Sequence, residues 1–229
     1  LPEPGWAVMR SGWDDDATVV ACGYRASARV FHSGWEMSGF SLWAGAKPLL
    51  PKLLGFRSYT TGFPEGFCRT PRQANHVLIK DAELRRVAGS LRNWSSSDQF
   101  DYLHVDHRGW RDGTITARRR LLFVKPEWVL IIDDIEGEGQ AELTWQAHTE
   151  EVLPSLSGRT ATVTNAEAIA TVTSLDADLK IETYPVPGME KTVHLLTADR
   201  TGTLPLRFVT LIHMGSTQSS APPRIGPIA

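Results

Sequence analysis

Position 32 holds one of the seven histidines of this sequence, and histidine is a side chain suited to proton transfer. His32 comes just before a Ser33-Gly34 turn signal and an apolar stretch. Imidazole titrates near neutral pH, so His32 is able to donate or accept a proton during a reaction. Taken alone, a histidine is more often a surface residue with ordinary hydrogen bonds. Trp35 follows three residues later, and an exposed indole there would stack on the face of a sugar ring.

A second polar segment, Arg69-Thr-Pro-Arg-Gln-Ala-Asn75, carries side chains of the types that bind carboxylate, sulfate and hydroxyl groups. A guanidinium group binds a carboxylate or sulfate through two parallel hydrogen bonds, and an amide binds a hydroxyl or an uncharged carboxyl. The alternative is structural, because such residues also satisfy backbone carbonyls where a loop enters a strand. For Arg69 and Asn75 both interpretations stay open, whereas for Arg72 we favour the structural one.

A third polar stretch, residues 100–110, alternates like a strand. Its alternation places Tyr102, His104 and Asp106 on one face, which resembles a set of acids and bases. The same residue types also cover the solvated face of an ordinary sheet. The stretch ends in Trp110, which cannot transfer a proton but would stack on a sugar.

Three arginines, residues 118–120, begin a long apolar strand. We favour a structural role for them over ligand binding. Arginines at such a position pair with acids on the neighbouring strand, and Asp133 and Asp134 are suitably placed across a hairpin.

Period-2 patterns recur along the chain and predict many short strands. These strands are expected at residues 17–24, 40–44, 75–80, 100–107, 115–125, 128–135, 141–149, 160–165, 169–175, 179–184, 192–198 and 207–214. The joints between them are rich in Gly, Pro, Asn and Asp, as turns require. This spacing predicts an all-β fold, an antiparallel two-sheet β-sandwich.

The domain organisation that follows is simple. Residues 1–215 are expected to form one sandwich domain, and residues 216–229, rich in Ser, Pro and Gly, an irregular tail. A short helical piece is expected at residues 82–88, and no stretch has the composition of a linker between domains.

Composition excludes several classes of protein. A net charge of −2 over 229 residues gives no reason to expect a nucleic-acid partner. No apolar run approaches the roughly 20 residues of a membrane-spanning helix. The two cysteines, Cys22 and Cys68, form no Cys-x-x-Cys motif, which makes redox chemistry or a thiolate zinc site improbable. The chain starts at Leu1 without a signal peptide, which we interpret as a processed form or an excised domain.

Five segments, taken in order, resemble the β-sheet domain of heparinase II/III-type polysaccharide lyases. They are residues 1–10 (LPEPGWAVMR), 31–40 (FHSGWEMSGF), 45–50 (GAKPLL), 69–75 (RTPRQAN) and 119–133 (RRLLFVKPEWVLIID). The resemblance implies that His32 is catalytic and that Arg69 and Asn75 bind substrate. Trp35 and Trp110 are added as substrate-binding residues on their residue type, and Trp110 stands where the family often has Tyr. The resemblance covers more than half of the chain.

The resemblance also implies a metal site whose ligands this chain lacks. The family usually has a His-x-His-x-Asp-like run, an Asp-Pro-Gly and a His-Asn pair. Here Gly34 stands at the second His, Pro51 at the Asp and Ala74 at the last His, and none has a donor side chain. Glu36 and His76 lie nearby, but two ligands do not make a site. We therefore predict no metal and no other cofactor.

By resemblance, the chain is expected to be the β-sandwich of a lyase that acts by β-elimination on acidic, uronate-containing polysaccharide such as a glycosaminoglycan or alginate. Its other expected partner is an N-terminal helical domain of the parent protein, without which it would be inactive. The parent would be bacterial and periplasmic or secreted. The alternative is a non-catalytic carbohydrate-binding or structural sandwich in a degenerate relative.

Overall fold

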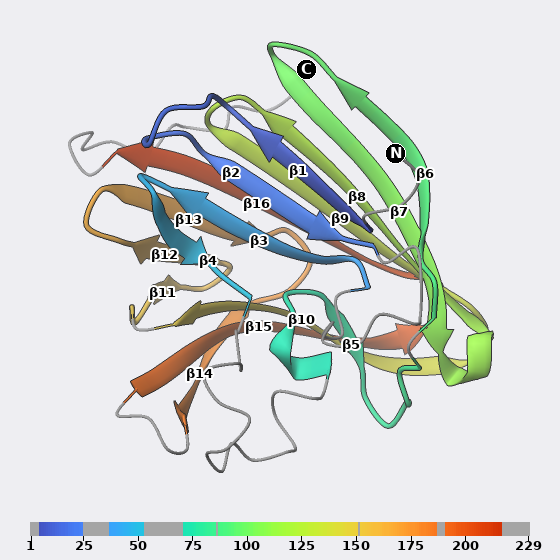
Figure 1. Ribbon diagram of the computed structural model, residues 1–229. Coiled ribbons are helices and arrows are strands. Elements are labelled where there is room, and N and C mark those ends of the chain that lie inside the picture. Colours follow the sequence, from blue (N-terminus) through green and yellow to red (C-terminus); the bar gives the residue numbers. More distant parts are fainter. Residues whose placement is uncertain are drawn as a thin grey trace, which may run out of the picture.

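The computed structural model describes residues 5–24, 37–52, 71–85, 87–150, 152–186 and 191–216. Within these residues sixteen strands form three sheets, and every strand pair is antiparallel (Figure 1). The only helical elements in this part of the chain are two short 3₁₀ turns, η1 (Pro71–Gln73) and η2 (Arg111–Gly113). The prediction of an all-β fold is therefore confirmed.

Sheet C is the largest and has eight strands. In spatial order they are β11 (Ser155–Ser157), β12 (Thr160–Thr164), β13 (Ala168–Ser174), β16 (Leu206–Ser216), β9 (Trp128–Glu136), β8 (Ile115–Val124), β7 (Phe100–Trp110) and β6 (Ser90–Ser96). Along β8 and β9, buried residues alternate with partly exposed ones. Because successive side chains of a strand point to opposite faces, one face of sheet C is covered and the other, here called the outer face, meets solvent.

Two four-stranded sheets make up the remainder. Sheet A has the order β1 (Trp6–Arg10), β2 (Val19–Gly23), β3 (Gly39–Ala44) and β4 (Lys47–Leu50). Sheet B has the order β14 (Leu179–Val186), β15 (Lys191–Thr203), β10 (Gln140–Glu150) and β5 (Val77–Ile79). A bridge between Phe40 and Asn75 connects β3 to the residues just before β5.

The core lies between sheet C and sheets A and B. Its buried apolar side chains come from all three sheets and form one continuous cluster. Phe40 of sheet A and Trp145 of sheet B pack with ring centroids 6.3 Å apart. Phe123 of sheet C is fully buried in the same cluster. The arrangement is the predicted sandwich, with sheets A and B together forming one layer.

The structure corrects two details of the sequence interpretation. No helix forms in the described residues of 82–88, where Leu84 instead makes a β-bridge to Trp110. Four short strands, β1, β4, β6 and β11, were not predicted. Strand β6 is almost wholly exposed, so it lacks the buried face that produces alternation. The division between residues 1–215 and the tail stays a prediction, since residues 217–229 lie outside the described chain.

The described part of the chain holds no helix with the length and apolar character needed to cross a bilayer.

Candidate functional site

Asn75 is the centre of a buried junction between the three sheets. Its side-chain nitrogen donates to the carbonyls of Leu50 and Pro51, each at 3.1 Å. Its side-chain oxygen accepts hydrogen bonds from the backbone N–H of His148 at 2.9 Å and from Nδ1 of the same residue at 2.8 Å. With no exposed area, the amide group uses its donors and its acceptor within the protein.

Arg119 joins the junction from the inward face of β8. It forms a two-pronged ion pair with Asp133 of β9, with Nε–Oδ1 and Nη2–Oδ2 distances of 2.7 and 2.8 Å. Its remaining Nη1 donates to the carbonyl of Asn75 at 2.9 Å and to that of Ser38. The predicted pairing across the β8–β9 hairpin is confirmed here, and again for Arg120 with Asp134 on the outer face.

Two further side chains fix the turn at residues 71–76. Gln146 of β10 donates from Nε2 to the carbonyl of Ala74 at 2.6 Å and to that of Arg72 at 3.1 Å. Nε2 of His76 lies 2.8 Å from the carbonyl of Pro71, which only accepts, so Nε2 carries the proton. The turn is thus held by side chains from β10 and from within itself.

Three buried histidines surround this junction, and burial lowers the pKa of each. The pKa of His76 falls to about 3, by desolvation first and then by the positive charge of Arg119 and by His107. That of His107 falls to about 4, by desolvation and then by Arg119. That of His148 falls to about 3, by desolvation and then by His76. All three imidazoles are therefore neutral at pH 7.

The junction holds together two parts of the chain that are far apart in the sequence, at Ser38 and at Asn75. Ser38 follows His32 by six residues, and Asn75 follows Arg69 by six. One guanidinium nitrogen of Arg119 holds the carbonyls of both Ser38 and Asn75. Arg119 therefore holds the chain at residues 38 and 75 close together, although the two positions are 37 residues apart in the sequence.

The residues proposed from sequence divide into two groups. His32, Trp35 and Arg69 lie outside the described residues. Asn75 and Trp110 are described, and both are buried, with 0% and 2% of their surface exposed. Asn75 is held as above, and the ring of Trp110 packs 6.4 Å from that of His76. These positions favour the structural interpretation of both side chains; contact with a substrate stays a prediction.

Sequence reasoning missed Gln146 and His148, which turn out to organise the site. On a strand with one solvated face they would point opposite to Trp145 and Ala147, and thus outward. Instead all four are buried, because the end of β10 is covered on both faces. The sequence carries no signal for them, because polar residues recur along the whole of β10 (QAELTWQAHTE) and these two do not stand out.

Two of the positions at which the resemblance implies metal ligands, Pro51 and Ala74, lie in the described part of the chain, and neither has a donor side chain. Pro51 and Ala74 are buried, and their carbonyls are already engaged by Asn75 and Gln146. Among the described residues, no three His, Cys, Asp or Glu side chains converge on one point.

We expect the purified chain to carry no stoichiometric zinc after desalting, because Gly34, Pro51 and Ala74 supply no ligands. Elemental analysis measures this directly. About one equivalent of zinc would contradict the expectation and would direct mutagenesis to Glu36 and His76.

Comparison with known proteins finds one matching family and several solved structures of similar fold. A family model described as heparinase II/III-like, C-terminal, matches residues 1–222. Solved structures of similar fold include a heparinase III, the BT4657 gene product, with a TM-score of 0.80 and 16% identity over 94% of this chain. Another is the heparan sulfate lyase HepC from Pedobacter heparinus, with a TM-score of 0.78 and 18% identity over 95% of this chain.

The alignment covers only part of those enzymes. This chain spans 35% of the first structure and 36% of the second. A comparison with curated protein sequences finds no match.

Proposed function

The chain belongs to the heparinase II/III-like family, as its C-terminal domain, and on that premise we propose that it is the β-sandwich of a lyase that cleaves uronate-containing polysaccharide by β-elimination. The observation that carries the proposal is the match to the family model, which runs from residue 1 to residue 222 of 229. The antiparallel sandwich agrees with it, since similar folds occur in heparinase III structures.

β-Elimination from a uronate makes three demands on an enzyme. The sugar carboxylate must be neutralised, the proton next to it must be removed by a base, and the leaving oxygen must receive a proton. A histidine with a pKa near neutrality serves the first or the last of these, and this is the role we propose for His32. Arg69 would bind the carboxylate through its planar guanidinium, and Trp35 would stack on a sugar ring.

In this proposal the buried junction positions the reacting residues and does not itself react. Arg119 and Asn75 fix the chain next to the segments that carry His32 and Arg69. A catalytic group must be held to within a fraction of an ångström, and this is achieved by rigid elements beneath it. The proposed role of Asn75 is therefore to hold the residues that contact the substrate in place, without touching the substrate itself.

The remaining machinery is proposed to lie in the helical domain of the parent protein. The chain spans about a third of the heparinase structures it resembles, so two thirds of such an enzyme has no counterpart here. We propose that the sandwich alone is inactive and that the substrate runs between the two domains. The acidic polysaccharide is a large extracellular polymer, which favours a periplasmic or secreted parent in a bacterium.

A second candidate function has one specific observation in its favour. The positions of the family's metal ligands hold Gly34, Pro51 and Ala74, so one part of the ancestral site is gone. A relative that has lost catalysis would keep the sandwich as a carbohydrate-binding or structural module.

The test uses the parent protein with its helical domain, incubated with uronate-containing glycosaminoglycans and with alginate. β-Elimination leaves an unsaturated sugar that absorbs ultraviolet light, so activity is measured as a rise in absorbance. We expect the His32→Ala variant to lower turnover by roughly 10²-fold, the lower part of the range for a general acid or base.

His213→Ala is the matched control. His213 lies on the outer face of β16, where its ring stacks on Trp128 at 4.4 Å, and its replacement is expected to leave turnover unchanged. Equal rates for the parent and for His32→Ala would assign His32 to structure. Absence of unsaturated product with every polymer, from a folded parent, would favour the non-catalytic module.

A further inference from the structure

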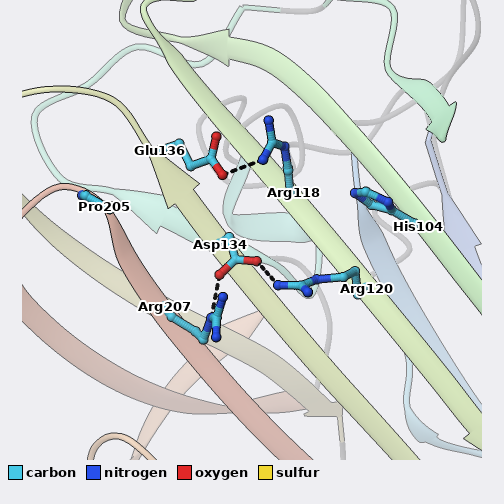
Figure 2. A pocket seen from close by; sticks show the side chains of 7 residues that line it. All are labelled: His104, Arg118, Arg120, Asp134, Glu136, Pro205 and Arg207. Carbon is cyan, nitrogen blue, oxygen red and sulfur yellow. Dashed lines mark hydrogen bonds and ion pairs between the residues drawn. The ribbon is translucent and has the colours of Figure 1, made fainter.

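A charged hollow lies on the outer face of sheet C, the face opposite to Arg119. It has a volume of about 360 Å³ and is lined by side chains of four adjacent strands (Figure 2). The lining residues are His104 of β7, Arg118 and Arg120 of β8, Asp134 and Glu136 of β9, and Pro205 and Arg207 at the start of β16. Ligand pockets in proteins begin at roughly 300 Å³, so the hollow is large enough for a small ligand.

Strand pairing explains why these side chains meet. Arg118, Asp134 and Arg207 stand opposite one another across β8, β9 and β16, and His104 stands opposite Arg120. Arg118 and Arg120 flank the inward-pointing Arg119 and therefore point outward. Figure 2 shows their guanidinium groups converging with that of Arg207 around Asp134 and Glu136.

The charges of the hollow do not cancel. Arg118 pairs with Glu136, while Arg120 and Arg207 share the single carboxylate of Asp134. Three guanidinium groups thus face two carboxylates, which leaves one positive charge unmatched. The neighbouring Asp106 does not supply the balance, because it is paired with Arg92 at 2.7 Å.

Hydrogen-bond donors are also in excess. A guanidinium group has five N–H bonds. Arg207 uses Nε for Asp134 at 2.5 Å, Arg120 uses Nη2 for the same carboxylate, and Arg118 uses Nη1 for Glu136. Among the described residues no further acceptor contacts the other nitrogens that these arginines present to the hollow. Donors from three strands suit an acceptor with several oxygens.

His104 supplies an independent observation at the same place. Its Nε2 is buried and has no hydrogen-bond partner among the described residues. The pKa of His104 is lowered, first by burial and then by Arg120, with Arg118 and Arg92 acting in the same direction and Asp106 opposing them. When Nε2 of this imidazole carries a hydrogen, an anion in the hollow supplies the missing acceptor for its N–H.

We propose that this hollow binds a sulfate group, either free or carried by a sugar, between Arg118, Arg120 and Arg207 with His104 at its edge. A sulfate offers oxygens to donors from several directions at once, and a sugar sulfate ester carries the one negative charge that matches the surplus. The site would lie on the opposite side of sheet C from the Arg119 junction, so it does not depend on the proposed lyase activity.

Inorganic sulfate is the first probe, added to the 229-residue chain in place of chloride at constant ionic strength. The readout is the imidazole signal of His104 in nuclear magnetic resonance, assigned by its loss in His104→Gln. We expect a saturable change and a rise in the pKa of His104, because a bound anion stabilises the imidazolium form. Arg207→Gln and Arg118→Gln should each weaken binding roughly tenfold, the effect of losing a hydrogen bond to a charged group.

Arg159→Gln is the matched control. Arg159 is an exposed arginine paired with Asp178 at 3.5 Å in the turn before β12, outside the hollow, and its loss should leave sulfate affinity unchanged. Melting temperatures check that all variants fold. A response that does not saturate, or that falls equally in Arg159→Gln and Arg207→Gln, would reflect general screening and overturn the proposal.

A disaccharide containing uronate and sulfate, compared with its desulfated form, identifies the source of the group. Tighter binding of the sulfated disaccharide than of inorganic sulfate would support a group carried by a sugar, and equal binding would support recognition of the sulfate alone. Equal binding of the sulfated and desulfated forms would overturn the proposal. None of these readouts requires catalysis, so failure of the lyase hypothesis would leave them unchanged.

Discussion

The free energy of unfolding is expected to fall steeply as the pH drops from 6.5 towards 4, because three buried histidines resist protonation in the folded chain. His76, His107 and His148 have folded pKa values of about 3, 4 and 3, against an ordinary value of 6.5. Desolvation by burial is the main cause of these low pKa values, and the positive charge of Arg119 adds to it for His76 and His107. Nδ1 of His107 accepts the backbone N–H of Gly109 at 3.2 Å, so a proton there would break that bond.

The sign of this pH dependence follows from the number of protons that the folded and unfolded states bind. Above pH 6.5 these residues are neutral in both states and contribute no pH dependence. Below it, the unfolded chain binds three protons that the folded chain excludes, so stability is lost until the pH reaches the folded pKa values. Near pH 5 the slope is roughly 4 kcal/mol per pH unit, and total stabilities are only about 5–15 kcal/mol. Most of the stability should therefore disappear within about two pH units.

Urea unfolding at a series of pH values measures the slope. His107→Gln removes one titrating group and should reduce the slope by about a third. His213→Gln is the control, because it makes the same change of residue type on the outer face of sheet C, away from the buried junction. Superimposable pH profiles for the unmodified chain and His107→Gln would show that buried imidazole is not the cause.

Replacing Arg119 by Met is expected to lower the free energy of unfolding by roughly 3–5 kcal/mol, the range for breaking a buried ion pair by removing one partner. The side chain of Arg119 is 0% exposed and that of Asp133 is 5% exposed. The substitution leaves the Asp133 carboxylate buried without its cation. It also leaves the carbonyls of Ser38 and Asn75 without their donor.

The adjacent arginine provides the control. Arg120→Met breaks the pair with Asp134 on the outer face, where water replaces the lost partner, and should cost no more than about 1 kcal/mol. The double variant Arg119→Met with Asp133→Leu should recover much of the loss, since no unpaired charge remains. Equal losses for the two arginines, or no recovery in the double variant, would exclude the buried charge as the explanation.

Strands and their pairing were predicted best where one face of a strand is buried and the other is exposed to solvent. Strands β8 and β9 follow such a pattern, and from it both the hairpin and the pairing of its arginines with Asp133 and Asp134 were predicted correctly. Strand β6 has no buried face and was missed. The expected helix at residues 82–88 failed because the bridge from Leu84 to Trp110 is a contact distant in sequence.

Burial of the site residues could not be predicted for a related reason. Alternation shows which side chains share a face, but it does not show what packs on that face. Asn75 was proposed as a substrate contact from the resemblance and Trp110 from its residue type, but both side chains are buried. The hollow on the outer face could be predicted only in part. Arg118 and Arg120 were noted in the sequence, but Arg207 comes from β16, more than 80 residues away.

The run Arg118-Arg119-Arg120 also guards against misfolding by strand slippage. A shift of one residue between β8 and its neighbours would exchange the two faces of the strand. Arg118 and Arg120 would enter the core together, away from their outer partners, while Arg119 would leave Asp133 behind. In the shifted register Arg118 and Arg120 would be buried without partners, and Asp133 would have no cation. That register would therefore be far less stable than the native one. A sheet of eight strands has many possible misaligned pairings. The arginine triplet favours the native register of β8 over registers shifted by one residue.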